Sequence, residues 1–94
     1  MEIEIKNDGS LTTIFVKGRI DTMTAPDLEN AIGTDLEDLT IDFTDVNYIS
    51  SAGLRVLLMA QKKIKGALKI AHPNNVVLDI FKLTGLDQAL TIED

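Results

Sequence analysis

The sequence lacks cysteine altogether and contains only one histidine, His72, among its 94 residues. Without cysteine the chain has neither a disulfide framework nor a thiolate nucleophile. This absence fits a reducing compartment, and we expect a cytoplasmic protein. Without a second histidine, no set of side chains is available for a transition-metal cluster or for a pair of nucleophile and histidine base. We therefore expect neither a metal nor a cofactor.

Long apolar runs and glycine-rich phosphate loops are also missing. No apolar stretch approaches the roughly 20 residues of a membrane span, so we expect no membrane insertion. The acidic, alternating start Met1–Ile5 does not resemble a signal peptide. Neither common phosphate-loop motif is present. Asp42 and Asp45 flank the end of a predicted strand, where aspartate usually forms turns, so we interpret them as exposed turn residues. The sequence predicts a protein that is not an enzyme.

Basic side chains are scarce, and the formal net charge is −6. Such a balance argues against a nucleic-acid partner, since proteins of that kind usually carry a basic patch. The charge is uneven, with eleven acidic and three basic side chains in residues 1–45 and four acidic and six basic in residues 46–94. The acidic half could steer a basic partner protein, or it could be ordinary solvated surface.

The residues that are present predict an α/β domain. Alternating apolar residues predict strands over 2–6, 11–20, 39–44 and 67–71, with a possible short strand at 90–92. Helical spacing predicts helices over about 24–32, 51–65 and 75–84. We expect one domain over residues 1–94, built on a single mixed, mostly parallel sheet with an N-terminal β-hairpin and three main helices.

Specific residues mark the ends of these elements. Asn7-Asp8-Gly9 predicts the hairpin turn, and Ile3 and Ile5 are expected to point inward from the first strand. Thr24 is expected to cap the first helix with its side chain, and Asn74 or Asn75 the third. The helices are expected to end at Gly33 with the acidic run 35–38, at Gly66 and at Gly85.

The chain changes character within residues 47–58, from strand alternation to helical spacing, and Ser50 and Ser51 lie at the change. A serine there could simply cap the helix, or it could expose its hydroxyl on a corner. Phosphorylation of an exposed serine would add about −1.5 to −2 charges. The helix dipole would tolerate this charge, whereas a partner packed over the corner would not. Asp21, Asp42 and Asp45 are expected to lie nearby and to repel the phosphate.

Residues 42–54 resemble the signature of bacterial anti-sigma-factor antagonists that consist of a stand-alone STAS domain. The similarity continues in Gly18-Arg19-Ile20-Asp21 and in Leu83-Thr84-Gly85-Leu86, and so covers nearly the whole chain. It implies a compact α/β fold with a phosphorylatable serine at the head of the second helix. It also implies that the unphosphorylated protein binds an anti-sigma factor with serine kinase activity, that phosphorylation ends this binding, and that a serine phosphatase restores it.

By position, this resemblance assigns the phosphorylated residue to Ser51, the acidic neighbour to Asp21 and the motif glycine to Gly53. The chain departs from the family at three positions: Ser50 replaces a common Asp and becomes a backup acceptor, Ala52 replaces Ser or Thr, and Arg55 replaces a small residue. The partner-binding surface is expected to comprise Asp21, Thr22, Ser50, Ser51, Ala52, Gly53 and Arg55.

Two other functions fit the same resemblance. A STAS module that is not phosphorylated could serve as a scaffold or adaptor in a lipid-transport or stress-signalling complex. A small nucleotide-binding protein is the third possibility, although the chain has no phosphate loop. Val56 and Met59 are interpreted as exposed apolar residues through which the chain could self-associate.

Overall fold

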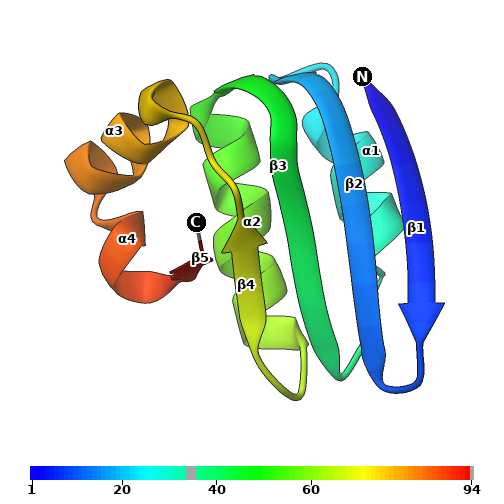
Figure 1. Ribbon diagram of the computed structural model, residues 1–94. Coiled ribbons are helices and arrows are strands. Elements are labelled where there is room, and N and C mark those ends of the chain that lie inside the picture. The colour runs from blue at the N-terminus through cyan, green and yellow to red at the C-terminus, as the bar shows by residue number, and fades with distance from the viewer. Residues whose placement is uncertain (34–35, 94) are drawn as a thin grey trace.

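The computed structural model describes residues 1–33 and 36–93, which form a five-stranded sheet covered by helices (Figure 1). The strands follow one another across the sheet in chain order. The first two are antiparallel and all later neighbours are parallel. The strands are β1 (Glu2–Asp8), β2 (Leu11–Ile20), β3 (Asp38–Ile49), β4 (Leu68–Ala71) and β5 (Thr91–Glu93). The predicted mixed sheet with an N-terminal hairpin is confirmed.

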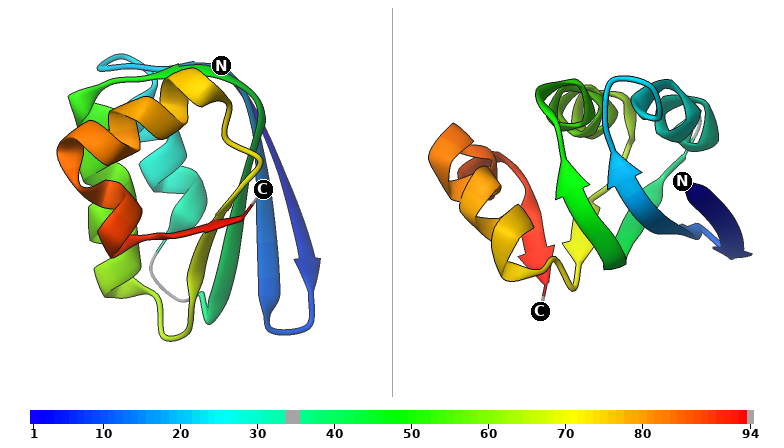
Figure 2. Two further views of the ribbon diagram at one scale, coloured as in Figure 1. Left: turned by 60° about the vertical axis from the view of Figure 1, so that its left-hand side comes forward. Right: turned by 90° about the horizontal axis from the view of Figure 1, so that it is seen from above.

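The described residues also form the helices α1 (Ala25–Ile32), α2 (Ser51–Lys63), α3 (Asn75–Thr84) and α4 (Leu86–Ala89). Figure 2 shows α1 and α2 side by side on one face of the sheet, with α3 and α4 beside β4 and β5. The short α4 was not predicted, because four residues are too few to show helical periodicity. None of the helices in the described ranges has the length and apolar character that crossing a membrane requires.

The core lies between the sheet and these helices. The contact between Phe43 of β3 and Phe81 of α3, with ring centroids 6.2 Å apart, joins α3 to the sheet. Burying one such side chain contributes roughly 1.5–3 kcal/mol. The largest fully buried side chains are Phe43, Phe81, Ile14, Ile20, Leu28, Leu39, Ile41, Ile49, Leu57, Ile70, Val16 and Val46.

The edge strand β1 is less buried than predicted. Ile3 is half-buried, but Ile5 is 46% exposed, so the prediction that both residues point into the core is wrong for Ile5. β1 forms one edge of the sheet, and α1 is the helix that packs against it. An alternating pattern identifies the face on which a residue lies, but it does not show how far a helix extends over that face.

The third strand is longer than predicted and runs directly into the corner. It spans Asp38–Ile49, not 39–44, and Asp45 pairs with Lys17 of β2. The pairing is irregular between Phe15 and Lys17 and again between Gly18 and Arg19. Each irregularity inserts an extra residue in β3, which breaks the two-residue alternation and makes the strand look shorter in sequence.

This extension corrects the interpretation of the two aspartates. Asp42 and Asp45 lie inside β3 instead of flanking its end. At about 3.3 Å per strand residue, Asp45 is roughly 15 Å from the corner at Ser50, and Asp42 is farther away. The prediction that these carboxylates lie beside the corner is therefore wrong.

Several predicted helix ends are confirmed. Gly33 and Gly85 follow α1 and α3 with φ angles of 66° and 80°, which glycine adopts without steric cost. Asn74 is the N-cap of α3, and its Oδ1 accepts a hydrogen bond of 2.9 Å from the Val77 N–H. The acidic run begins at Asp35, which lies outside the described residues, whereas residues 36–38 lead into β3 as expected.

The predicted end of α2 is wrong. The helix stops at Lys63, and Ile64 is already extended and buried. Gly66 does not end the helix in a left-handed residue. Its N–H donates to the Glu37 carbonyl at 2.7 Å, and a Cβ atom at this glycine would lie 2.8 Å from that same oxygen. Glycine is required here for close backbone approach.

Candidate functional site

The candidate site is the corner at which β3 turns into α2. The Ser50 N–H donates to the Ile20 carbonyl at 2.8 Å, which joins the carboxyl ends of β2 and β3. Ser50 is the N-cap of α2: its Oγ accepts from the Gly53 N–H at 3.3 Å, and its carbonyl accepts from the Leu54 N–H at 2.9 Å. The capping alternative therefore describes Ser50.

Ser51 occupies a different position. It is the first helical residue of α2, and it is exposed, whereas Ser50 is half-buried. The hydroxyl of a residue at this position is not the one that caps the helix. It lies at the positive end of the helix dipole, where added negative charge is favourable. The corner therefore combines one structural serine with one accessible serine.

The motif glycine permits the helix to start close to the sheet. Gly53 is buried, and a Cβ atom there would lie 2.6 Å from Cγ2 of Ile20 and 2.7 Å from Cγ1 of Ile49. Both isoleucines are fully buried and pair across β2 and β3. Any larger residue would push the first turn of α2, with Ser51, away from the strand ends.

Asp21 organises the loop between β2 and α1. Its Oδ1 accepts hydrogen bonds from the N–H groups of Met23 and Thr24, both at 3.0 Å, and its carbonyl accepts from the Ala25 N–H at 2.8 Å. The Thr24 hydroxyl accepts from the Asp21 N–H and lies 2.8 Å from the Arg19 carbonyl. Thr24 is the N-cap of α1 by position, but the predicted side-chain cap is wrong because this hydroxyl bonds back into the loop.

These bonds also stabilise the charged form of Asp21. The hydrogen bond from the Thr24 N–H lowers the pKa of the Asp21 carboxyl below its ordinary value. Bonds from the Thr24 hydroxyl and the Met23 N–H and the charge of Arg19 act in the same direction, while desolvation opposes them. Asp21 is therefore a carboxylate at neutral pH, next to the strand end that contacts Ser50.

A cation stacked on an aromatic ring lies beside this carboxylate. The Arg19 guanidinium is 4.5 Å from the centre of the Tyr48 ring, and its Nε is 3.9 Å from Asp21 Oδ2. Arg19 and Tyr48 pair across β2 and β3. The ion pair is solvent-accessible and contributes little to stability, so its main effect is on the charge of the corner surface.

The remaining predicted site residues lie around the same corner with different exposure. Thr22 is exposed in the loop after Asp21. Ala52 is half-buried in the first turn of α2, and Arg55 is exposed one turn beyond Ser51. All of them belong to the two segments that the Ser50–Ile20 hydrogen bond joins. Arg55 lies farther along α2 than the others.

Sequence reasoning missed Met23, which is 84% exposed in the loop that Asp21 organises. The sequence did contain a signal, because Met23 is an apolar residue between two threonines, Thr22 and Thr24, in a segment where no core residue is expected. Sequence alone does not reveal side-chain exposure in such a loop, because no periodicity applies outside helices and strands.

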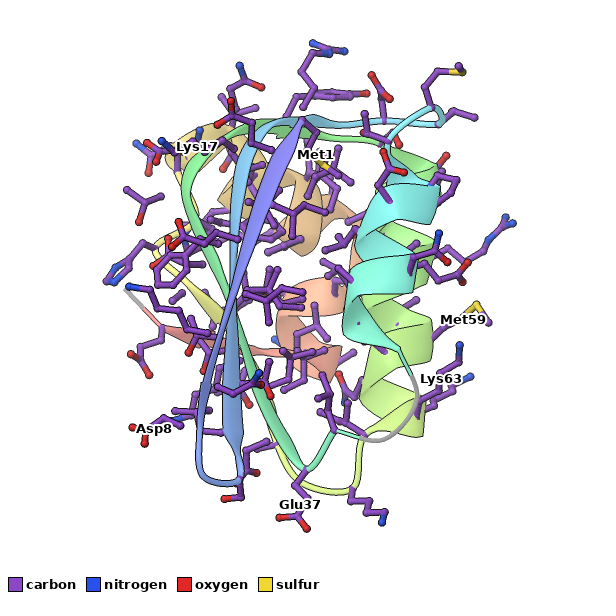
Figure 3. The ribbon with its side chains drawn as sticks, turned by 90° about the vertical axis from the view of Figure 1, so that its right-hand side faces the viewer. Met1, Asp8, Lys17, Glu37, Met59 and Lys63 are labelled. Atoms are coloured by element: carbon purple, nitrogen blue, oxygen red, sulfur yellow. The ribbon has the colours of Figure 1, made fainter. Side chains whose placement is uncertain are left out.

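The two residues considered for self-association separate in the structure. Val56 is only 8% exposed, so its assignment to the surface is wrong. Met59 is 41% exposed and points away from the sheet on the outer side of α2, as does Lys63 (Figure 3). Val56 is covered because α1 packs beside α2, and it lines the same small gap as Glu29 and Ile32 of α1.

The similarity to known proteins extends over nearly the whole chain, including the corner between β3 and α2. A family model described as "Mlab, STAS domain" matches residues 3–92. The anti-sigma-B factor antagonist of Listeria monocytogenes is 32% identical over 100% of this chain and 90% of its own length. A solved anti-sigma factor antagonist of Mycobacterium paratuberculosis is 26% identical, with a TM-score of 0.85, over 98% of this chain and 84% of its own. A solved Thermotoga maritima protein shares the fold, with 20% identity and a TM-score of 0.88 over 98% of this chain and 86% of its own.

Proposed function

This chain belongs to the STAS-domain family of anti-sigma factor antagonists, and on that premise we propose that it is switched by phosphorylation of Ser51. Unmodified, it binds an anti-sigma factor that is also a serine kinase and thereby releases a sigma factor. Phosphorylation by that kinase ends the binding, and a serine phosphatase restores it. The relatives are named anti-sigma-B factor antagonists, which describes regulators and not enzymes, and we assign this chain the same kind of role.

The observation that supports Ser51 as the acceptor is the difference between the two serines. Ser50 Oγ is engaged with the Gly53 N–H, whereas Ser51 is exposed at the first position of α2. A kinase must reach the hydroxyl that it modifies, and the helix cap need not be broken when Ser51 is modified. Ser50 remains the backup acceptor, at the cost of losing its capping bond.

The replacement of the common Asp by Ser50 leaves the helix cap intact. Asp and Ser are comparably good N-cap residues, because each offers an oxygen to the free N–H groups of the first turn. The change removes one negative charge from the corner. Asp42 and Asp45 lie farther back in β3, whereas Asp21 follows Ile20, whose carbonyl is bonded by the Ser50 N–H.

Phosphorylation is expected to change the surface and not the fold. A negative charge in the first turn of a helix is stabilising by about 0.3–1 kcal/mol. Arg55 is four residues after Ser51 on the same helix, a spacing at which opposite charges attract weakly. Repulsion from Asp21 offsets part of this gain. The bulk and charge would instead oppose a partner packed over the corner.

The decisive experiment is an affinity pull-down from the native cell lysate with the wild-type chain, Ser51→Asp and Ser51→Ala as baits. Retained proteins are identified and tested for ATP-dependent phosphorylation of each bait. We expect a kinase that binds wild type and Ser51→Ala but not Ser51→Asp, and that phosphorylates wild type but not Ser51→Ala. Ser50→Ala is the matched control, and it should still be phosphorylated.

The alternative scaffold function predicts a different outcome. All three baits would then retain the same proteins, none of them a kinase, and Ser51 would have no regulatory role. Phosphorylation of Ser51→Ala at full level, with loss in Ser50→Ala, would move the acceptor to Ser50. Saturation binding of a labelled nucleotide to the wild-type chain tests the third possibility.

A further inference from the structure

Met23 is an apolar side chain that the fold does not use. It is 84% exposed, in the loop that joins β2 to α1. Isolated exposed apolar residues are common on protein surfaces and need no explanation by themselves. Met23 differs from that background in two respects: its backbone is held in place, and it lies at the corner described above.

The backbone on both sides of Met23 is fixed by hydrogen bonds that do not involve its side chain. Asp21 Oδ1 accepts from the N–H groups of Met23 and Thr24, both at 3.0 Å. The Asp21 carbonyl accepts from the Ala25 N–H at 2.8 Å, and the Thr24 hydroxyl bonds the Asp21 N–H at 2.8 Å. A partner that buries Met23 would therefore have little loop entropy to remove, which favours binding.

The position of the loop connects it to Ser51. Asp21 follows Ile20, whose carbonyl accepts the hydrogen bond from the Ser50 N–H at 2.8 Å. The loop and the first turn of α2 thus leave the sheet at neighbouring strand ends, on the edge at which β2 and β3 finish (Figure 1). A protein that covers Ser51 would meet Thr22 and Met23 next.

We propose that Met23 is an apolar anchor that inserts into an apolar pocket of the anti-sigma factor and contributes to the choice of partner. This inference rests on the proposed function, because the partner is the one that Ser51 regulates. Methionine suits such a contact, since its unbranched, polarisable side chain adapts to the shape of a pocket. Met23 supplies attraction, and the phosphate on Ser51 supplies the repulsion that ends the complex.

The test measures binding of the purified anti-sigma factor that is retained by the wild-type chain, using isothermal titration calorimetry. The variants are Met23→Gln, which keeps the length but adds a polar amide, and Met23→Leu, which stays apolar. Leu83→Gln is the matched control, because Leu83 is 86% exposed but lies near the end of α3, on the β4–β5 side of the molecule.

We expect Met23→Gln to bind about tenfold to a hundredfold more weakly than wild type, the range that burial of one apolar side chain implies. Met23→Leu and Leu83→Gln should bind within about threefold of wild type. All three variants should melt at the wild-type temperature, because exposed substitutions of this kind rarely change stability.

Two results would overturn the inference while leaving the switch intact. One is that Met23→Gln binds the anti-sigma factor with wild-type affinity, in a preparation to which Ser51→Asp no longer binds. The other is an equal loss of affinity in Met23→Gln and Leu83→Gln, which would indicate nonspecific apolar contacts of the surface and not a specific anchor. If the wild-type chain retained no anti-sigma factor at all, the proposed function would fail, and this inference would fail with it.

Discussion

Replacing Gly53 by alanine tests whether α2 must start in close contact with the sheet. The new Cβ would lie 2.6 Å from Ile20 Cγ2 and 2.7 Å from Ile49 Cγ1, distances that force one of the two elements to move. Neither contact atom is the flexible end of a long side chain, and both isoleucines are fully buried. The strain therefore cannot be relieved by a surface rotamer change.

The size of the effect follows from two opposing terms. Inserting a methyl group into a packed core costs about 1–3 kcal/mol. Alanine is a better helix former than glycine by about 0.5–1 kcal/mol, which offsets part of that cost. We expect Gly53→Ala to lower the free energy of unfolding by about 1–2 kcal/mol and the melting temperature by roughly 5–15 °C.

Equilibrium urea unfolding of wild type, Gly53→Ala, Ile49→Val and the double variant measures this effect. Ile49→Val alone should cost about 0.5–1.5 kcal/mol. In the Gly53→Ala background it should cost less or even stabilise, because it removes Cδ1, which lies 3.2 Å from the new Cβ, and gives the remaining atoms room to shift. Wild-type stability of Gly53→Ala, or strictly additive effects of the two substitutions, would refute the packing argument.

Two further predictions concern the residues on either side of this contact. Ser50→Ala should lower the free energy of unfolding by about 0.5–1 kcal/mol through loss of the cap bond, which at 3.3 Å is long, whereas Ser51→Ala should leave it unchanged within about 0.5 kcal/mol. Urea unfolding of both variants checks this, and a larger loss in Ser51→Ala would show that the cap had been assigned to the wrong serine. Because the loop bonds lower the pKa of Asp21 in the folded state, its charge stabilises the fold above the ordinary value of 3.8, and this stabilisation is lost as the pH falls through the folded-state pKa. The stability difference between wild type and Asp21→Asn, followed by urea unfolding from neutral pH to well below 3.8, should therefore narrow on acidification, and a constant difference would argue against this role of Asp21.

Much of the fold could be predicted because burial in this chain follows simple periodicity. β2 begins and ends where its alternation does, at Leu11 and Ile20, and α3 ends at Thr84, directly before the predicted Gly85. The prediction failed where the period was interrupted. The irregular pairing in β3 hides the second half of that strand, and the assignment of Asp42 and Asp45 to the corner failed with it.

Prediction of the candidate site from the sequence is also limited, because periodicity does not reveal the role of a single side chain. The pair Ser50 and Ser51 was identified from the change between strand and helix periods, but their separate roles depend on which oxygen reaches the Gly53 N–H. Thr24 does not cap α1 with its side chain as expected, because its hydroxyl bonds the Asp21 N–H and the Arg19 carbonyl instead. The choice of one hydroxyl between several backbone partners is not visible in a list of residues.

The sequence by itself determined the α/β class, the order of strands and longer helices, and the location of the serine corner. These properties follow from local periodicity and from turn residues, which act over a few positions along the chain. Only the tertiary structure decided that Val56 is buried, that Met23 is exposed, and which side chains a Cβ atom at Gly53 would meet. Each of these depends on how closely α1, α2 and the strand ends approach one another, a distance between segments that are far apart in the chain.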